Sequence, residues 1–343
     1  MNFVSDNAYG AAPEMFEALR KANEGPGASY GEDALTQGLQ AELARIFEHD
    51  VVVFSVITGT AANALVLSTI TPSYGAIFCH SDAHIVTDEC GAPELFTQGA
   101  KVIAVEGAHG KISPEALEQA ISRFAPGSVH HSQPATISIT QASEMGTCYR
   151  PEDVRAIASI AARHRMTLHM DGARLANAIA FLGCTPAEAT WKAGVDALSF
   201  GMTKNGAFGA EAVVFFHSEH VRDFAFRRKK FGHLLSKMRF VSAQFACALE
   251  NDRWLTWARL ANDLARSLAQ RLAGISDIAI VHPVEANLVF ASIPEWLGQR
   301  LRARGAQFYD WGPSSAGCRL VRFVTSFATP EKDIDRLIAA ASA

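Results

Sequence analysis

The sequence of 343 residues has few charged side chains and no surplus of either sign. Aspartate, glutamate, lysine and arginine make up 19% of it, below the share of about a quarter in typical domains, so we expect subunit contacts to cover part of the surface. Lysine and arginine number 31 against 35 acidic residues, and the net charge of -4 provides no basic field for a polyanion. The composition therefore predicts an oligomer that does not bind nucleic acid.

Three further absences limit the class of protein. The six cysteines are scattered without a C-x-x-C pair, so we expect reduced thiols and no metal site. Apolar runs such as Val51–Ile57 are far shorter than the roughly 20 residues that cross a bilayer. Residues 1–7 show no basic start before an apolar stretch, as a secretion signal would. These absences predict a cytoplasmic protein without a membrane partner.

Runs rich in β-branched residues alternate with helical stretches between about residues 50 and 216. The predicted strands are 51–57, 76–79, 102–105, 136–140, 166–170, 197–200 and 212–216. Helix start signals stand between them, for example Ser113-Pro114-Glu115 and Arg150-Pro151-Glu152. The alternation predicts an α/β fold with a mostly parallel sheet covered by helices.

The two ends of the chain have a different organisation. Residues 13–22 and 35–47 have helical apolar spacing and form a predicted arm that reaches across a partner subunit. A long predicted helix at 254–272 precedes strands near 278–281, 288–293 and 320–324. We therefore expect the arm and a large domain over residues 1–250 and a small α/β domain over residues 251–343.

Polar residues follow the predicted strands, at the edge where ligands bind in doubly wound sheets. Thr58-Gly59-Thr60 leads into a helix, where free backbone N–H groups attract an anion. Asp171 follows the strand at 166–170 and suits a protonated ring nitrogen or a metal, while Arg174 suits a carboxylate or a phosphate. Each signal alone is also typical of an ordinary cap or turn.

Lys204 and His84 follow two other predicted strands. Burial lowers the pKa of a loop lysine and exposes an amine that forms a Schiff base. A histidine in such a place stacks on an aromatic ring or transfers protons, although a solvated lysine and a satisfied polar histidine are the commoner outcomes. Together the strand ends provide what pyridoxal phosphate needs: a lysine, an acid for the ring nitrogen, a phosphate cradle and a group over the ring.

This combination resembles the low-specificity L-threonine aldolases, which belong with the β-eliminating lyases among the fold-type I pyridoxal phosphate enzymes. The resemblance covers nearly the whole chain and rests on Ser5-Asp6, Tyr30-Gly31, Thr58-Gly59-Thr60 with Asn63, His84 with Glu89, Asp171-Gly172-Ala173-Arg174, Thr203-Lys204 and residues 320–325. It implies the fold of aspartate aminotransferase. It also implies cleavage of L-threonine, L-allo-threonine and related β-hydroxy-α-amino acids, such as phenylserine, into glycine and an aldehyde.

The resemblance implies a role for each matching residue. Lys204 forms the Schiff base, Asp171 pairs with the ring nitrogen and His84 stacks on the ring. The expected phosphate and cofactor ligands are Gly59, Thr60, Thr203, Arg174 and Arg239. The expected ligands of the substrate carboxylate are Arg174 and Arg322 with Ser5, and Tyr30 is a further expected substrate-binding residue. Arg239 comes from a neighbouring subunit, so the active sites are shared, and the resemblance also implies a homotetramer.

The residues leave two questions open. The base that takes the β-hydroxyl proton is His84, His130, or a water held by a histidine or by Glu89. The cofactor residues also suit β-elimination, transamination or racemisation, and an α/β scaffold without catalysis is a further alternative. The whole motif set favours retro-aldol cleavage, and the presence of Lys204 and Asp171 disfavours the scaffold.

Overall fold

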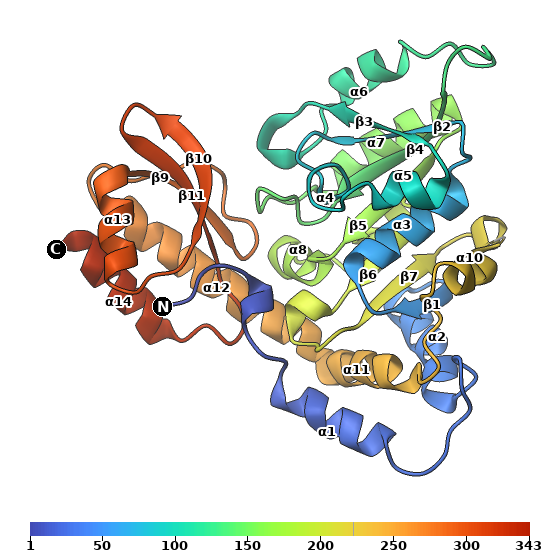
Figure 1. Cartoon of the computed structure of the whole chain (residues 1–343), viewed down its shortest axis with the longest axis horizontal. Coiled ribbons are helices and arrows are strands. Elements are labelled where there is room, and N and C mark those ends of the chain that lie inside the picture. Colours follow the sequence, from blue (N-terminus) through green and yellow to red (C-terminus); the bar gives the residue numbers. More distant parts are fainter. Residues whose placement is uncertain (222) are drawn as a thin grey trace.

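The computed structural model describes residues 1–221 and 223–343, which form a large and a small α/β unit (Figure 1). The large unit contains a seven-stranded sheet in the order β1-β7-β6-β5-β4-β2-β3. Its strands are β1 (Val52–Val56), β2 (Gly75–His80), β3 (Lys101–Val105), β4 (Gln133–Thr140), β5 (Thr167–Gly172), β6 (Ala197–Gly201) and β7 (Glu211–Phe215). Neighbours are parallel except β7, which is antiparallel to β1 and β6. The predicted strands and the mostly parallel sheet are confirmed.

Helices surround this sheet (Figure 1). They are α1 (Pro13–Ala22), α2 (Ala34–Phe47), α3 (Gly59–Ile70), α4 (His84–Thr87), α5 (Ala92–Thr97), α6 (Pro114–Ile121), α7 (Pro151–His164), α8 (Leu175–Leu182), α9 (Pro186–Ala189), α10 (Phe224–Lys230) and α11 (Arg239–Leu249). The start signals act as expected: the Ser113 hydroxyl accepts from the N–H of Ala116, and Pro114 opens α6. Helix α1 packs on α11, which packs on α2.

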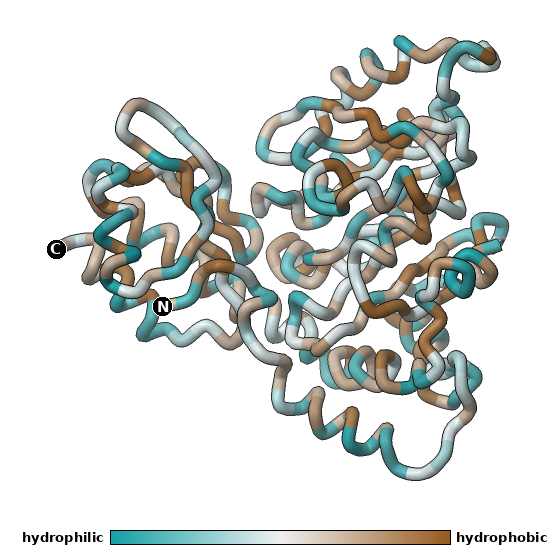
Figure 2. Tube along the Cα trace, in the orientation of Figure 1, coloured by the Kyte–Doolittle hydropathy of each residue, from teal (hydrophilic) through white to brown (hydrophobic). Residues whose placement is uncertain are grey.

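Strands β2, β6 and β7 of the large sheet are buried at every position, whereas the edge strand β3 has exposed residues. Val213 and Val214 are consecutive and fully buried, yet they belong to hydrophobic clusters on opposite faces of the sheet. Burial on both faces explains why strands such as β7 appear in the sequence as mostly apolar runs, and Figure 2 shows hydrophobic segments throughout the large unit. None of the described helices is long and apolar enough to cross a membrane.

The small unit contains an antiparallel sheet in the order β10-β11-β9-β8. Its elements are α12 (Arg253–Ala273), β8 (Ala279–Ile280), β9 (Leu288–Pro294), α13 (Glu295–Ala303), β10 (Tyr309–Ser315), β11 (Cys318–Val324) and α14 (Glu331–Ser342). The sequence did not indicate β10, because Gly312 and Pro313 are typical of a turn. An exposed edge strand accommodates them, since its outer N–H groups need no partner.

The first residues of the chain pack against the small unit. The N–H of Phe3 donates to the carbonyl of Gln307 at 2.8 Å, and the N–H of Val324 donates to the carbonyl of Phe3 at 2.9 Å. The chain then crosses to α1 on the large unit, while α12 runs between the two units (Figure 1). The proposed division at residue 250 stays a prediction, and residues 1–3 lie with the small unit.

Candidate active site

The polar residues that follow the strands meet in a cavity of about 250 Å³ at the carboxyl edge of the large sheet. Its lining comprises Asn7, Ile57, Thr58, Gly59, Thr60, Asn63, His84, Glu144, Asp171, Ala173, Thr203, Lys204 and Glu211. Parallel strands end at the same edge, which brings together turns that are far apart in the sequence. The structure thus brings six expected residues to one place: Gly59, Thr60, His84, Asp171, Thr203 and Lys204.

Asp171 and His84 are connected by a buried hydrogen-bond network. The side-chain amide of Asn63 donates to Asp171 Oδ2 and to Glu89 Oε1, both at 2.8 Å. Glu89 Oε1 also lies 2.8 Å from His84 Nδ1, and the N–H of Ala173 donates to Asp171 Oδ1 at 3.0 Å. The hydrogen bond with Glu89 raises the pKa of His84. Both side chains are therefore held in one orientation, and the imidazole is biased toward its protonated form.

The N-terminus of α3 provides donors for an anion. The Thr58 hydroxyl caps the helix by accepting from the N–H of Ala61 at 3.2 Å. The N–H groups of Gly59 and Thr60 lie in the first turn, where they have no acceptor within the helix. A Cβ built on Gly59 would meet no atom within 4 Å, so the space before these donors is open. This donor set, together with Lys204 and Asp171, fits pyridoxal phosphate.

The two expected carboxylate-binding arginines differ in their surroundings. Arg174 is buried and donates to Asp6 at 2.8 Å and 3.1 Å. Arg322 lies over the rings of Tyr309 and Trp311, with its guanidinium carbon 4.9 Å and 4.8 Å from their centroids. Its Nε is buried without a hydrogen-bond partner, and no carboxylate in residues 1–221 and 223–343 pairs with it. Of the two arginines, Arg322 is therefore the one whose guanidinium has no carboxylate partner in the described part of the chain.

Ser5, Tyr30 and Arg239 do not line the cavity of their own chain. Ser5 lies beside it, since its hydroxyl accepts from the N–H of Asn7 at 3.1 Å. Tyr30 is exposed and its N–H donates to the carbonyl of Ser236 at 2.8 Å. Arg239 donates from Nε to the carbonyl of Ala22 at 2.9 Å. A role for Tyr30 or Arg239 in a site would therefore have to be in another copy of the chain.

His130 lies outside the cavity of its own chain, and its catalytic role stays a prediction. It is exposed in the loop before β4, while Thr140 at the far end of β4 pairs with Asp171. The length of β4 separates the two ends by roughly 23 Å, at about 3.3 Å per residue. The physical reason is the direction of the strand: a residue that precedes a parallel strand lies at the amino edge of the sheet, opposite the ligand-binding edge.

Several polar residues near the cavity received no role from the sequence: Asp6, Asn7, Asn63, Glu144, Glu211 and Asn287. Two of them could have been recognised as buried polar residues from the sequence. Glu211 is a lone charge in the apolar run 210–216, and Asn63 is a lone polar residue in the apolar helix segment 61–67. A charged or amide residue in such a run has to find a buried partner. Asp6 stands in a polar segment and gave no local signal.

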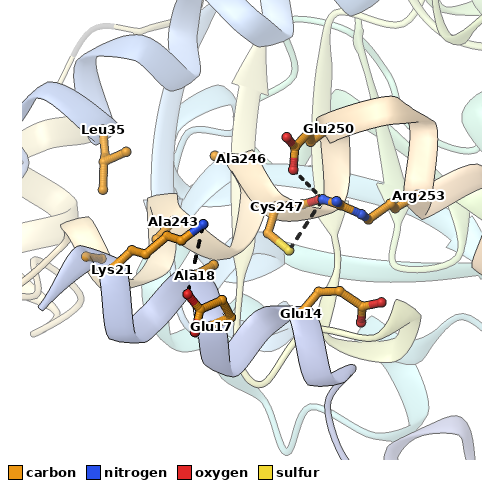
Figure 3. Close-up of a pocket in the computed structure, with 11 residues that line it drawn as sticks. Glu14, Glu17, Ala18, Lys21, Leu35, Ala243, Ala246, Cys247, Glu250 and Arg253 are labelled. Atoms are coloured by element: carbon orange, nitrogen blue, oxygen red, sulfur yellow. Dashed lines mark hydrogen bonds and ion pairs between the residues drawn. The ribbon is translucent and has the colours of Figure 1, made fainter.

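A larger pocket of about 490 Å³ lies between α1 and α11 (Figure 3). Its wall includes Ala18, Ala243 and Cys247, and four of its five charged side chains form two ion pairs. Lys21 lies 4.0 Å from Glu17, and Arg253 pairs with Glu250. None of the residues that follow the strands of the parallel sheet lines it, so size alone does not make it the reactive site.

The sheet, the lysine, the buried aspartate and the anion cradle define a fold-type I pyridoxal phosphate enzyme. The model of the beta-eliminating lyase family matches residues 2–295. The chain belongs to this family. It is 43% identical to the low specificity L-threonine aldolase of a Pseudomonas species (strain NCIMB 10558), over 98% of this chain and 96% of that one. The enzyme of the same name from Pseudomonas aeruginosa is 42% identical, over 98% and 94%.

Solved structures agree with this assignment. Threonine aldolase from Leishmania major superposes with a TM-score of 0.93 at 25% identity, over 99% of this chain and 98% of that one. Serine palmitoyltransferase from Sphingomonas wittichii superposes with a TM-score of 0.73 at 16% identity, over 100% and 86%. The second comparison extends the common fold to a more distant enzyme.

Proposed function

We propose that the chain is a pyridoxal phosphate-dependent aldolase that cleaves L-threonine, L-allo-threonine and related β-hydroxy-α-amino acids, including phenylserine, into glycine and an aldehyde. The observation that carries the proposal is the meeting of Lys204, Asp171 and the α3 N-terminus in one cavity. The chain is also 43% identical to a low specificity L-threonine aldolase over almost its full length.

Different residues of the cavity bind different parts of the cofactor. Lys204 Nζ would hold pyridoxal phosphate, whose ring would supply an electron sink for the Cα–Cβ bond of a substrate joined to it through the substrate amine in place of the lysine. Asp171, fixed by Asn63 and the N–H of Ala173, holds the proton on the ring nitrogen. Gly59, Thr60 and Thr203 hold the phosphate, and His84 lies over the ring.

Arginine holds the substrate carboxylate. Arg322 offers a planar fork without a carboxylate partner of its own. Arg174 lies near it, since burial and then the charge of Arg174 lower the pKa of Arg322, and Ser5 is the third proposed ligand. Fixing the carboxylate orients the Cα–Cβ bond, and positioning of this kind lowers a barrier by several kcal/mol, on the order of 7 in favourable cases.

His84 is the residue that accepts the β-hydroxyl proton, directly or through a water. The only other candidate imidazole in the sequence analysis, His130, lies at the opposite edge of the sheet in its own chain. Glu89 orients His84 through the 2.8 Å contact with Nδ1, which leaves Nε2 for the substrate. The carboxylate also stabilises the imidazolium that forms when the proton arrives.

Product analysis tests the reaction. Purified protein is incubated with L-threonine, L-allo-threonine or phenylserine, and glycine and aldehyde are measured. Release of both in equal amounts supports aldol cleavage, whereas a 2-oxo acid with ammonia would show elimination and reject the proposal. Lys204→Ala should lose both the activity and the absorbance of the bound cofactor. Lys192→Ala, on a surface ion pair with Glu48, is the matched control and should keep both.

Assembly and location are part of the same proposal. A homotetramer with shared sites is supported by Tyr30 and Arg239, which lie outside the cavity of their own chain. A cytoplasmic location is supported by the six cysteines, all of which are unpaired. Light scattering and activity measured together over a dilution series test the assembly, and a fully active monomer would reject shared sites.

A further inference from the structure

Glu211 is a buried carboxyl group in the cavity that the proposed reaction does not use. It begins β7 and pairs with Gly201 at the end of β6, so it lies beside the loop that carries Thr203 and Lys204. Its exposed fraction is 5%. A Cβ built on Gly201 would lie 2.7 Å from Glu211 Oε2, which means that the glycine makes room for this carboxyl group.

The surroundings of Glu211 favour its neutral form. No lysine, arginine or histidine within the described ranges forms an ion pair with it. Burial raises the pKa of Glu211 to about 7, and the charge of Asp171 acts in the same direction, while Lys204 and hydrogen bonds from Thr203 oppose it. The other titratable groups that line the cavity are His84 and Glu144. On the side of β1, Arg228 donates to the carbonyl of Ser55 rather than to Glu211.

Thr203 connects Glu211 to the expected phosphate site. Its hydroxyl oxygen accepts from the N–H of Ala210 at 3.1 Å, and it lines the same cavity as Glu211, close enough for its hydrogen bonding to lower the pKa of that carboxyl group. A hydroxyl has a single hydrogen to donate. If Glu211 is ionised, it accepts that hydrogen. If Glu211 is protonated, it donates to the Thr203 oxygen instead, and the Thr203 hydrogen is free to point to another acceptor in the cavity.

We propose that Glu211 is a positioning residue for the cofactor phosphate: its protonated form turns the Thr203 hydroxyl toward the phosphate, and its ionised form holds that hydroxyl back. The inference rests on the proposed function, because it takes the phosphate of pyridoxal phosphate as the ligand of Thr203 and the α3 N-terminus. Binding of the dianionic phosphate is then coupled to uptake of one proton by Glu211. The ionised carboxylate also repels the phosphate, which strengthens the coupling.

Calorimetric titration of the full chain, freed of cofactor, with pyridoxine 5'-phosphate measures this coupling. The probe has the phosphate but no aldehyde, so no bond to Lys204 contributes. Titrations at about one pH unit above the pKa of Glu211, in two buffers of different ionisation enthalpy, give the protons taken up per site. The wild type should take up close to one proton more than Glu211→Gln. The matched control Glu144→Gln, a carboxyl group of the same cavity, should behave as the wild type.

Thr203→Val provides a second, independent measurement. At about one pH unit below the pKa of Glu211, loss of the hydroxyl should weaken binding of the probe about tenfold, as expected for a hydrogen bond to a charged group. Well above that pKa the loss should be much smaller, since the wild-type hydroxyl is already held by Glu211. A structural effect of the valine would give the same ratio of dissociation constants at both pH values.

The outcomes separate the two proposals. If the probe binds but proton uptake is equal in the wild type and Glu211→Gln, the proposed role of Glu211 is wrong. The same follows if Thr203→Val changes the dissociation constant by the same factor at both pH values. If the probe does not bind and the protein acquires no absorbance from added pyridoxal phosphate, the proposed function fails and the role of Glu211 fails with it.

Discussion

Arg174 and Asp6 form a buried ion pair in which Nε lies 2.8 Å from Oδ2 and Nη2 lies 3.1 Å from Oδ1. Asn287 of the small unit donates to the same carboxylate at 3.1 Å. Burial alone would raise the pKa of Asp6, but the charge and hydrogen bonds of Arg174 hold it below its usual range. The pair thus joins the N-terminal segment, the end of β5 and the small unit at the edge of the cavity.

Removing Asp6 should destabilise the fold. Asp6→Ala leaves the Arg174 guanidinium buried without a partner, and loss of one member of a buried pair costs about 3–5 kcal/mol. Urea unfolding followed by circular dichroism measures the change. Asp263→Ala, which breaks an exposed pair with Arg266, should cost less than about 1 kcal/mol. Similar losses in the two variants would contradict a structural role for the buried pair.

Arg322 should determine affinity for the substrate carboxylate. Arg322→Ala removes two or more charge-assisted hydrogen bonds, so kcat/KM for L-threonine should fall about 100-fold. Arg322→Lys should not restore it, because an ammonium lacks the planar fork that lies over Tyr309 and Trp311. Arg319→Ala on the same strand removes a side chain paired with Asp310 and should leave kcat/KM nearly unchanged. Normal kinetics in Arg322→Ala would assign the carboxylate to other residues.

Glu89 should set the pH at which His84 gains its proton. The carboxylate raises the pKa of His84, so Glu89→Gln lowers that pKa. If neutral His84 is the base, activity rises as pH increases through this pKa, and the acid limb of kcat/KM should move to lower pH in the variant. Glu106→Gln, on an exposed side chain, is the control. An unmoved acid limb in Glu89→Gln would show that another group controls the profile.

Glu211 should make the cofactor-free protein less stable as the pH rises. Its pKa is about 7 in the folded chain against 4.5 for a free glutamate, so the unfolded state loses its proton first. Stability is therefore lost progressively between these two pH values and the loss is constant above them, at about 3 kcal/mol in total by linkage. Glu211→Gln should abolish this part of the slope. Unfolding free energies measured across that range in both proteins test it, and parallel curves would reject it.

The sequence by itself determined the seven strands of the large sheet and their alternation with helices. Runs rich in apolar and β-branched residues marked the strands of the large sheet, because its central strands are buried on both faces and need mostly apolar side chains. The carboxyl ends of parallel strands lie at one edge of the sheet. This topological rule predicts that Lys204, Asp171, His84 and the Thr58-Gly59-Thr60 turn lie close together, and they line one cavity. The sequence did not indicate the strand β10, because its edge position tolerates glycine and proline, which are typical of turns.

Only the tertiary structure decided which polar groups became partners. Asp6 and Arg174 lie 168 positions apart and Asn63 and Asp171 lie 108 apart, so no local period could join them. The same limit applies to His130, whose loop precedes its strand and lies at the other edge of the sheet in its own chain. Hydrophobic periodicity records burial along one element, whereas a buried hydrogen bond depends on how separate elements pack. The sequence therefore predicted the sheet and the main cavity residues, and the fold alone settled the pairs that orient them.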